Sequence, residues 1–507
     1  MTLTSASAFL DRCVTGLARL FSRPTPTPRR RISVASPNAD ALARIEHVVV
    51  LQLENRSFDH MLGFLKCEGV LPYVNGIDDS LPPNEWNNER FPLHPLQRTC
   101  FIKAEDPDHG SASVRMQLEG DNGGFVRNFV ETRKQHDVHG MPIDEKGNPI
   151  DPGLVMGYYT AKDLPVYKHL AEQFCVCDRW FSSVPGATWP NRLYTLTGKS
   201  AGSPDDNETP RGPIYNQASI VRFLEASGIS WRWYSHDPAT LRMVDRRYRF
   251  GYHEHFAYFD RRAVSELTRD LEHPFVAENS FLDDIAEECL PQVAWIDPNF
   301  IDLSVWESGS NDDHPPSDVH DGQRLVLAVY DALASSERYW DKTLLVVTYD
   351  EHGGFYDHVT PPACEDDDPR FRTYGLRVPA LLVSPLIEPG RVNRTTYDHA
   401  SIIKTLLLRF CRDGSGTIPD MGARVNAALD LGGALTRATP RPAPDREAVR
   451  QAVLAWQTSA VERRSSNLLG TRTRKDSEER TLSEFQAGFV HAVRGLREKG
   501  RLPSGRP

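Results

Sequence analysis

Long apolar runs are absent from this chain: no stretch approaches the roughly 18 consecutive apolar residues that a membrane-spanning helix needs. An excess of positive charge is absent too, because 59 Lys and Arg residues stand against 69 Asp and Glu residues, and the formal net charge is −10. A nucleic-acid-binding protein usually shows a basic surface instead. The sequence therefore predicts neither a transmembrane segment nor a nucleic-acid partner, and an anionic substrate would need local positive charge such as a metal ion.

Cysteines are few and scattered, with eight in 507 residues and no spacing typical of a zinc site or a disulfide framework. Cys175 and Cys177 would point to the same face of a strand without the geometry of a usual bridge. Buried reduced thiols are the simplest interpretation, and they favour a reducing compartment. The first residues also lack a clear signal peptide. We therefore expect a cytoplasmic or non-classically exported protein, and the sequence does not decide between the two.

Strand-like apolar runs alternate with helical patterns, which is typical of a βαβ sheet. The predicted strands are residues 48–53, 174–177, 292–296, 343–349 and 380–383. Two predicted crossover helices, residues 323–335 and 399–410, carry apolar side chains at helical spacing. Residues 75–160 and 200–280 are polar and weakly periodic, so we expect insertions that leave the sheet and build the walls of a pocket.

The two ends differ from the middle of the chain. We predict a flexible arm over residues 1–43, with a short amphipathic helix at 10–21, and one main domain over residues 44–437. Residues 438–507 read as a Pro-rich linker followed by a helical extension, with helices at 445–461 and 482–496. No cluster in this extension carries chemistry.

The apolar strand that begins at Thr343 ends abruptly in Asp350 and Glu351, followed by two glycines and two histidines. Ligand sites of open α/β sheets lie at the carboxyl ends of strands, so these acids indicate a metal or catalytic site. The alternative is an ordinary solvated turn, since Asp, Glu and Gly are common turn residues.

A second strand of the same kind ends in Glu54 and Asn55. If the two strands were neighbours in a parallel sheet, their ends would supply four hard oxygen ligands. Such a set suits a divalent cation held mainly through carboxylates.

Thr188 stands between Pro-Gly and Pro-Asn-Arg, just before a predicted helix. Backbone N–H groups at a helix start can face an anion, and a metal can turn a Thr hydroxyl into a nucleophile. The alternative is that Thr188 only caps the helix that Pro190 begins. The nearby Arg192 and the separate acid clusters favour the nucleophile.

Two histidines follow Asp-rich segments. His314 stands between Asp312-Asp313 and two prolines, which suits an oriented imidazole, while the alternative is an Asp-rich turn before a helix. His109 follows Asp106-Pro-Asp at the start of an insertion, where a lone surface histidine is a common alternative.

The motifs Glu-Asn-Arg-Ser-Phe-Asp-His, Asp-His, Thr-x-Pro-Asn-Arg, Asp-Asp-His-Pro-Pro and Asp-Glu-His-Gly-Gly-Phe-Tyr-Asp-His occur in this order between residues 45 and 410. This order resembles the phosphoesterase family of bacterial phospholipases C, plant non-specific phospholipases C and bacterial acid phosphatases. The resemblance implies an alkaline-phosphatase-like α/β sandwich with a central, mostly parallel sheet flanked by helices.

The resemblance also implies roles for single residues. One divalent metal ion (Ca, Mg, Mn or Zn) is expected to bind Glu54, Asn55, Thr188, Asp350 and Glu351. Thr188 is the expected nucleophile, and the other expected catalytic residues are His109, His314 and His358. Arg192 and His352 are predicted to bind the substrate, and His253 and His255 are weaker candidates.

The implied activity is that of a phospholipase C, which releases diacylglycerol and a phosphorylated head group from phosphatidylcholine or a related phospholipid. Peripheral contact with a membrane would accompany it. The alternatives are an acid phosphatase acting on phosphomonoesters and a binding module that keeps the fold without turnover.

Overall fold

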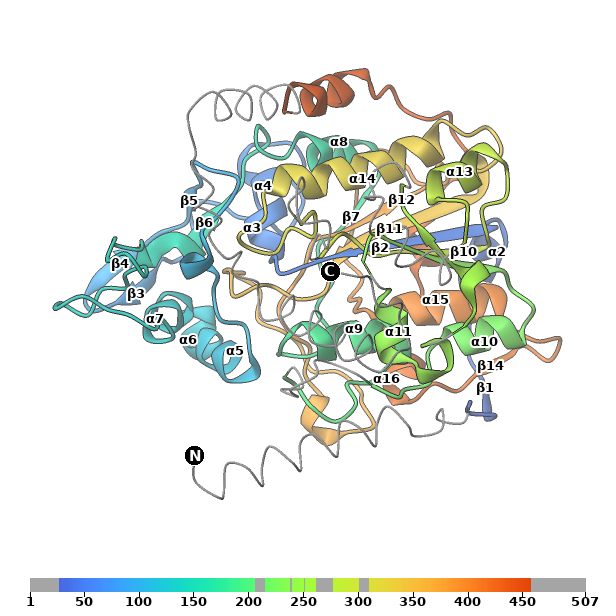
Figure 1. Ribbon diagram of the computed structural model, residues 1–507, viewed down its shortest axis with the longest axis horizontal. Helices are drawn as coiled ribbons and strands as arrows, with labels where there is room; N and C mark the ends of the chain where they lie inside the picture. The colour runs from blue at the N-terminus through green and yellow to red at the C-terminus, as the bar shows by residue number, and fades with distance from the viewer. Residues whose placement is uncertain are drawn as a thin grey trace, which may run out of the picture.

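A central eight-stranded sheet organises the protein (Figure 1). The computed structural model describes residues 27–205, 215–237, 239–249, 251–260, 277–300 and 310–456. The strands lie in the order β13-β7-β12-β11-β2-β10-β8-β9. Their bounds are β2 (His47–Leu53), β7 (Cys175–Cys177), β8 (Trp231–Ser235), β9 (Phe256–Tyr258), β10 (Val293–Ile296), β11 (Thr343–Tyr349), β12 (Ala380–Val383) and β13 (Arg391–Asn393). All neighbouring pairs are parallel except the two that β12 makes, with β11 and with β7.

Helices cover both faces of this sheet, which confirms the predicted α/β class. On one face lie α8 (Pro165–Gln173), α13 (Phe281–Ala286) and α14 (Val319–Ala334), and on the other lie α9 (Thr188–Thr197), α10 (Val221–Ala226) and α15 (Ala400–Phe410). The other α-helices with both ends among the described residues are α2 (Ala39–Ala43), α3 (Phe58–Leu62), α4 (Phe64–Cys67), α5 (Ser111–Gln117), α6 (Glu119–Asn122), α7 (Phe125–Glu131), α11 (Thr240–Val244) and α16 (Ala423–Ala427). Among the helices that the structure describes, none is long and apolar enough to cross a membrane.

The two central strands are buried along their whole length. Every residue of β2 and of β11 is buried, because both faces of the sheet are covered and both strands consist mainly of Val and Leu. Helix α14 begins where the Asp318 side chain accepts a hydrogen bond from the His320 N–H, and it buries an apolar stripe against the sheet. Burial of this kind is the main favourable contribution to folding, at about 25 cal/mol per Å² of apolar surface.

Most of the predicted elements are found, and some were missed. The five predicted strands are present, and the two predicted crossover helices correspond to α14 and α15. The segment 200–280 is more than a pocket wall, because it contributes β8 and β9 to the sheet. Strand β13, with the short polar sequence Arg-Val-Asn, was also missed.

The predicted flexible arm needs correction in its second half. Within residues 27–43, β1 (Arg31–Ser33) pairs antiparallel with β14 (Thr417–Pro419), and α2 contacts α15. The predicted helix at 10–21 lies outside the described residues, as does the one at 482–496. Of the helix predicted at 445–461, residues 447–456 are described and helical, and Trp456 stacks on His320 with ring centroids 3.9 Å apart.

The insertion at residues 75–160 forms a separate layer beside one end of the sheet (Figure 1). It contains α5, α6 and α7 together with the short strands β3 (Asn84–Trp86), β4 (Glu89–Phe91), β5 (His94–Pro95) and β6 (Gly157–Tyr158). The loop that leads into α5 carries Asp106 and His109 and reaches back to the end of β2, where His109 contacts Asn55.

Candidate active site

The carboxyl ends of β2 and β11 lie side by side. Tyr349 is paired with Leu53, so the next residues on each strand, Asp350 and Glu54, are neighbours. The Asn55 N–H donates to Asp350 Oδ1 at 3.0 Å, which ties the two ends together. Glu54, Asn55, Asp350 and Glu351 are all fully buried. The predicted juxtaposition of the two strand ends is therefore confirmed, and a solvated turn is excluded.

Glycine is required where the two loops touch. Gly353 has φ +66°, and a Cβ atom on it would lie 2.0 Å from the Asn55 carbonyl oxygen. Asn55 itself has φ 58°, in the left-handed region that Asn tolerates better than most residues. Glycine at position 353 thus allows the loop after β11 to approach the backbone of Asn55. The conformation of that backbone sets the direction of the Asn55 side chain.

Thr188 is the first residue of α9, and Ala187 occupies the capping position. No side chain caps this helix, which excludes the structural alternative that Thr188 serves as the cap. The Thr188 hydroxyl instead lies 3.5 Å from Asn55 Oδ1. The loop before it is held by Asn191, whose amide bonds to the carbonyl oxygens of Val184, Gly186 and Ala187.

Arg192 lies one helical turn after Thr188, on the same face of α9. Its Nε is 3.1 Å from Asp350 Oδ2, and its Nη2 is 3.1 Å from Glu54 Oε1. Sequence reasoning assigned Arg192 to the substrate, whereas the contacts in the structure are with two carboxylates.

His109 and His314 face the Asn55 amide from two directions. Asn55 Nδ2 lies 3.1 Å from His109 Nε2 and 3.3 Å from His314 Nε2. The two rings lie edge to face, with centroids 5.8 Å apart. Their other nitrogens are also held, because His109 Nδ1 contacts the Pro107 carbonyl and His314 Nδ1 contacts Glu54 Oε2. The structure therefore brings both predicted histidines to Asn55, which also contacts Thr188.

Asp106 and Asp312, which stand near the predicted histidines in the sequence, were given no role there. Asp106 Oδ2 lies 3.3 Å from His314 Nε2, and the Asp312 carbonyl accepts a hydrogen bond from the Glu54 N–H at 2.8 Å. Arg56 Nε donates to the Asp313 carbonyl at 2.8 Å, so the Asp312-Asp313-His314 loop is joined residue by residue to the end of β2.

His352 and His399 hold the acids of β11 from behind. His352 is buried, with Nδ1 3.3 Å from Glu351 Oε2 and Nε2 2.7 Å from Gln117 Oε1. His399 Nε2 donates to the Asp350 carbonyl at 2.6 Å, and burial lowers the pKa of His399 to about 4, which keeps the ring neutral. Sequence reasoning missed His399 and Gln117, because nothing in the local sequence marks them.

His358, a predicted catalytic residue, lies in a different cluster. Its Nδ1 contacts Asp59 Oδ2 at 2.6 Å, and its Nε2 lies 3.0 Å from Asn75 Oδ1. None of its described hydrogen bonds or ion pairs reaches Thr188 or Asn55. The weaker candidates are elsewhere too, since His255 stacks on Trp231 of β8, with ring centroids 4.3 Å apart.

Two groups of residues could hold a metal ion. Within the described residues, Asp59, Asp357 and His358 form the group of three Asp, Glu, His or Cys ligands whose atoms lie within 4.8 Å of one another. Arg377 already lies against both carboxylates, at 3.0 Å from Asp59 and 2.8 Å from Asp357. Because this guanidinium compensates the two negative charges, the cluster resembles a closed ion-pair network more than an open cation site.

The oxygens around Thr188 fit a hard cation. Among the described residues, the buried Glu351 Oε1 has no hydrogen-bond partner. Two oxygens that bind one Mg²⁺ or Ca²⁺ at an oxygen–metal–oxygen angle near a right angle lie about 3 to 3.7 Å apart, because metal–oxygen distances are about 2.0 to 2.6 Å. The 3.5 Å between Thr188 Oγ1 and Asn55 Oδ1 falls in that range.

Charge balance gives a second indication. Burial raises the pKa of Asp350 to about 7, and the neighbouring Glu351 adds to this shift while Arg192 opposes it. Burial likewise raises the pKa of Asp312 to about 7, with Glu54 adding to the shift. With a pKa near 7, these carboxyl groups are neutral at acid pH, and a divalent ion beside them would favour the ionised form.

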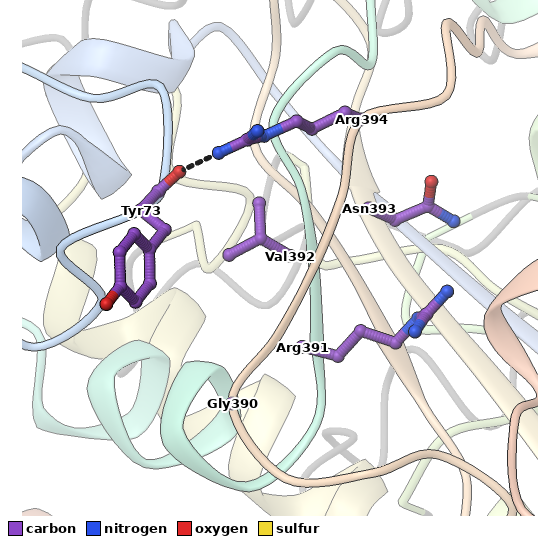
Figure 2. A pocket seen from close by; sticks show the side chains of 6 residues that line it. All are labelled: Tyr73, Gly390, Arg391, Val392, Asn393 and Arg394. Carbon is purple, nitrogen blue, oxygen red and sulfur yellow. Dashed lines mark hydrogen bonds between the residues drawn. The ribbon is translucent and has the colours of Figure 1, made fainter.

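A surface cavity of about 380 Å³ lies elsewhere, at the edge strand β13 (Figure 2). It is lined by Tyr73, Gly390, Arg391, Val392, Asn393 and Arg394. Figure 2 shows the Arg394 guanidinium donating to the Tyr73 carbonyl, at 2.6 Å, and the Arg391 side chain directed away from Tyr73. None of the candidate site residues lines this cavity.

Comparisons with known proteins agree with the motifs. The model of the phosphoesterase family matches residues 45–411. The non-specific phospholipase C6 of Arabidopsis thaliana is 35% identical over 391 residues, which is 71% of this chain and 67% of the relative. The phospholipase C B of Mycobacterium tuberculosis is 30% identical over 426 residues, 74% of this chain and 75% of the relative.

Among solved structures, the chain is similar to a protein of the alkaline phosphatase superfamily from Vibrio parahaemolyticus. The identity is 12%, the match covers 53% of this chain and 63% of the other, and the TM-score is 0.29.

Proposed function

The chain belongs to the phosphoesterase family and is a phosphoric ester hydrolase, and we propose that it is a phospholipase C. Its substrate is phosphatidylcholine or a related phospholipid, which it cleaves to diacylglycerol and a phosphorylated head group. The plant and mycobacterial relatives named above carry that activity in their names.

The observation that carries the mechanism is the environment of the Thr188 hydroxyl. It stands at the start of α9, makes no capping bond, and faces the Asn55 amide between two carboxylate-bearing strand ends. A hydroxyl that stabilises nothing in the helix, next to buried acids and histidines, has the surroundings of a nucleophile. Thr188 is therefore the residue that attacks phosphorus.

One divalent metal ion completes the site in this proposal. Glu54, Asn55, Thr188, Asp350 and Glu351 would supply its oxygen ligands, and Ca, Mg, Mn and Zn are all candidates. When bound there, the ion would lower the pKa of the Thr188 hydroxyl and neutralise charge on a phosphoryl oxygen. His352 and His399 hold the Glu351 and Asp350 ligands in place from the second layer.

The reaction proceeds in two displacements. The deprotonated Thr188 oxygen attacks phosphorus, the bond to the glycerol oxygen breaks, and a histidine gives its proton to the departing diacylglycerol. Thr188 then carries the phosphorylated head group as an ester. Water attacks that ester from the side that the alcohol left, the histidine takes a proton from the water, and the head group departs with Thr188 regenerated.

His109 and His314 are the histidines placed for these steps, because both contact Asn55, the residue that faces Thr188. Without a metal ion, the negative charges of Glu351 and Asp106 raise the pKa of His109 to about 9, although burial opposes the shift. A protonated imidazole is both a proton donor and a partner for phosphoryl oxygens. His358 would act less directly, from the Asp59 and Arg377 cluster.

A comparison of substrates tests the proposal. The full chain is offered phosphatidylcholine, phosphatidylethanolamine and sphingomyelin in mixed micelles, and p-nitrophenyl phosphate as a monoester, each at acid and neutral pH. We expect faster turnover of at least one phospholipid than of the monoester, with metal content measured on the same preparation. Equal or faster turnover of the monoester would identify an acid phosphatase instead.

A further inference from the structure

Arg192 is surrounded by acceptors from the strand ends. Besides its ion pairs with Glu54 and Asp350, its Nη2 donates to the carbonyl oxygens of Gln52 and Leu53, both at 3.3 Å. The guanidinium also lies over the Phe300 ring, 4.9 Å from the centroid. Only 2% of the residue is exposed. The nitrogens that face the strand ends, Nε and Nη2, already contact carboxylates, so a substrate phosphate could reach these two nitrogens only by displacing one.

The same contacts fix the carboxylates. Asp350 Oδ1 accepts from two backbone N–H groups, those of Asn55 at 3.0 Å and Glu351 at 2.7 Å, so Arg192 holds the other oxygen, Oδ2. Glu54 Oε2 contacts His314 Nδ1, so Arg192 again faces the remaining oxygen, Oε1. Without the guanidinium, one oxygen of each carboxylate would lose its contact with Arg192, and each carboxylate could turn more freely. Two buried negative charges would also be left side by side.

A carboxylate oxygen that accepts one hydrogen bond still has a lone pair for a metal ion. Partners of this kind, which do not touch the metal, orient its ligands, and their loss commonly lowers metal affinity or activity by about 10- to 100-fold. The hydrogen bond of Arg192 to Asp350 Oδ2 and its ion pair with Glu54 Oε1 match that pattern on two of the five proposed ligands.

Helix α9 adds a second consequence. Thr188 and Arg192 are four residues apart on one face, and Thr195, one turn further, accepts a hydrogen bond from Gln52 of β2 at 3.0 Å. The ion pairs of Arg192 therefore also fix the rotation of α9, and with it the direction of the Thr188 hydroxyl.

We infer that Arg192 is a positioning residue, which orients the Glu54 and Asp350 carboxylates for a divalent metal ion and holds α9 against them, and does not bind the substrate phosphate. This inference rests on the proposed metal-dependent phospholipase C function, and it gives Arg192 a role within that site.

The test uses the full chain, stripped of metal with a chelator and dialysed. Mn²⁺ and Ca²⁺ are titrated by calorimetry into the unsubstituted chain, Arg192→Gln and Arg192→Lys, and the kinetics of phosphatidylcholine hydrolysis follow at a fixed metal concentration. Gln removes the charge, while Lys keeps it but loses the planar fork. We expect metal affinity to fall by about 10- to 100-fold in Arg192→Gln and less in Arg192→Lys, with kcat reduced and KM unchanged.

A matched control is Arg222→Lys. Arg222 is equally buried and pairs with Asp245 through two nitrogens, in α10 and away from the site. This variant keeps the charge but loses the two-nitrogen fork of a comparable buried ion pair, so its thermal stability falls while its metal affinity stays that of the unsubstituted chain. If Arg192→Gln does not fold, the Lys variant and its melting curve with and without Mn²⁺ carry the comparison.

The outcomes separate two failures. Unchanged metal affinity with a raised KM in both Arg192 variants would overturn the inference and make Arg192 a substrate ligand. An unsubstituted chain that binds Mn²⁺ but hydrolyses no phospholipid would instead overturn the proposed function, while the metal titrations would still decide the role of Arg192.

Discussion

The Thr188 hydroxyl and the Asn55 side-chain oxygen lie 3.5 Å apart, at the limit of a hydrogen bond. The two residues are 133 positions apart in the sequence, and each is held by its own backbone: Thr188 by the start of α9 and Asn55 by a left-handed conformation at the end of β2. In the proposed site both oxygens are ligands of one divalent ion, and the distance between them suits that arrangement. That arrangement leads to separate predictions for the hydroxyl and for the metal ligands.

The hydroxyl of Thr188 is expected to be indispensable, and its methyl group is not. Thr188→Val keeps the shape of the side chain without the nucleophile, and should lower kcat for phosphatidylcholine by on the order of 10⁴- to 10⁶-fold. Thr188→Ser keeps a hydroxyl and should retain measurable turnover. Release of the phosphorylated head group is the measurement. Comparable activity in the Val and Ser variants would remove Thr188 from the role of nucleophile.

The location of the metal can be tested by a pair of isosteric substitutions. Glu351→Gln is expected to lose bound metal and activity, because it removes the charge of a proposed ligand whose Oε1 has no described hydrogen-bond partner. Asp357→Asn is expected to keep the metal and to lower the free energy of unfolding by about 3 to 5 kcal/mol, because it breaks a buried pair with Arg377. Metal content is measured by elemental analysis of purified protein. The opposite result would place the ion at the Asp59 and His358 cluster.

The sequence predicted the strand ends better than their surroundings. The run from Thr343 to Tyr349 is recovered to the residue, because a continuous β-branched and apolar segment has few other structures available in a parallel sheet. Strand β8, with the sequence Trp-Arg-Trp-Tyr-Ser, was missed because its aromatic and charged residues lie in a long polar segment. Strand β13 has three residues and pairs with the sheet on one side, so little apolar pattern is needed to form it.

The same difference holds for the site. Acids that follow an apolar strand are visible in a sequence, and so Glu54, Asn55, Asp350 and Glu351 could be grouped before their contacts were known. His399 and Gln117 could not, because each supports the site through a single contact across 49 or 235 positions. His358 shows that closeness in sequence can also mislead. It is only six residues beyond His352, yet the two rings contact different clusters.

Gly353 should tolerate no side chain. In Gly353→Ala the new Cβ would lie 2.0 Å from the Asn55 carbonyl oxygen, so the β2 loop must move, and Asn55 with it. We expect activity to fall sharply and the free energy of unfolding to drop by more than the roughly 1 to 2 kcal/mol that a left-handed Ala costs. Gly228→Ala is the control, because Gly228 has φ +72° and nothing within 4 Å of its Cβ position. Gly228→Ala should lower the free energy of unfolding by the same cost of a left-handed Ala and should keep full activity. Equal activities in the two variants would show that the Asn55 loop can move without loss of function.

Asp313 should make the protein less stable as the pH rises. Burial raises the pKa of this carboxyl group from 3.8 to about 8, and Asp312 and Asp318 add to the shift, while the hydrogen bond from Tyr349 and the charge of Arg56 oppose it. The folded chain therefore keeps a proton that the unfolded chain releases above about pH 4. Its contribution to the free energy of unfolding is complete below pH 4 and falls between pH 4 and 8, by at most about 1.4 kcal/mol per pH unit. Asp313→Asn is uncharged at every pH and still offers the Tyr349 hydroxyl an acceptor, so it should flatten this slope. Urea unfolding at pH 5 and at pH 8 measures the free energy of unfolding of both chains. The difference between the variant and the unsubstituted chain should shift in favour of the variant from pH 5 to pH 8. An equal difference at both pH values would mean that Asp313 does not titrate in this range.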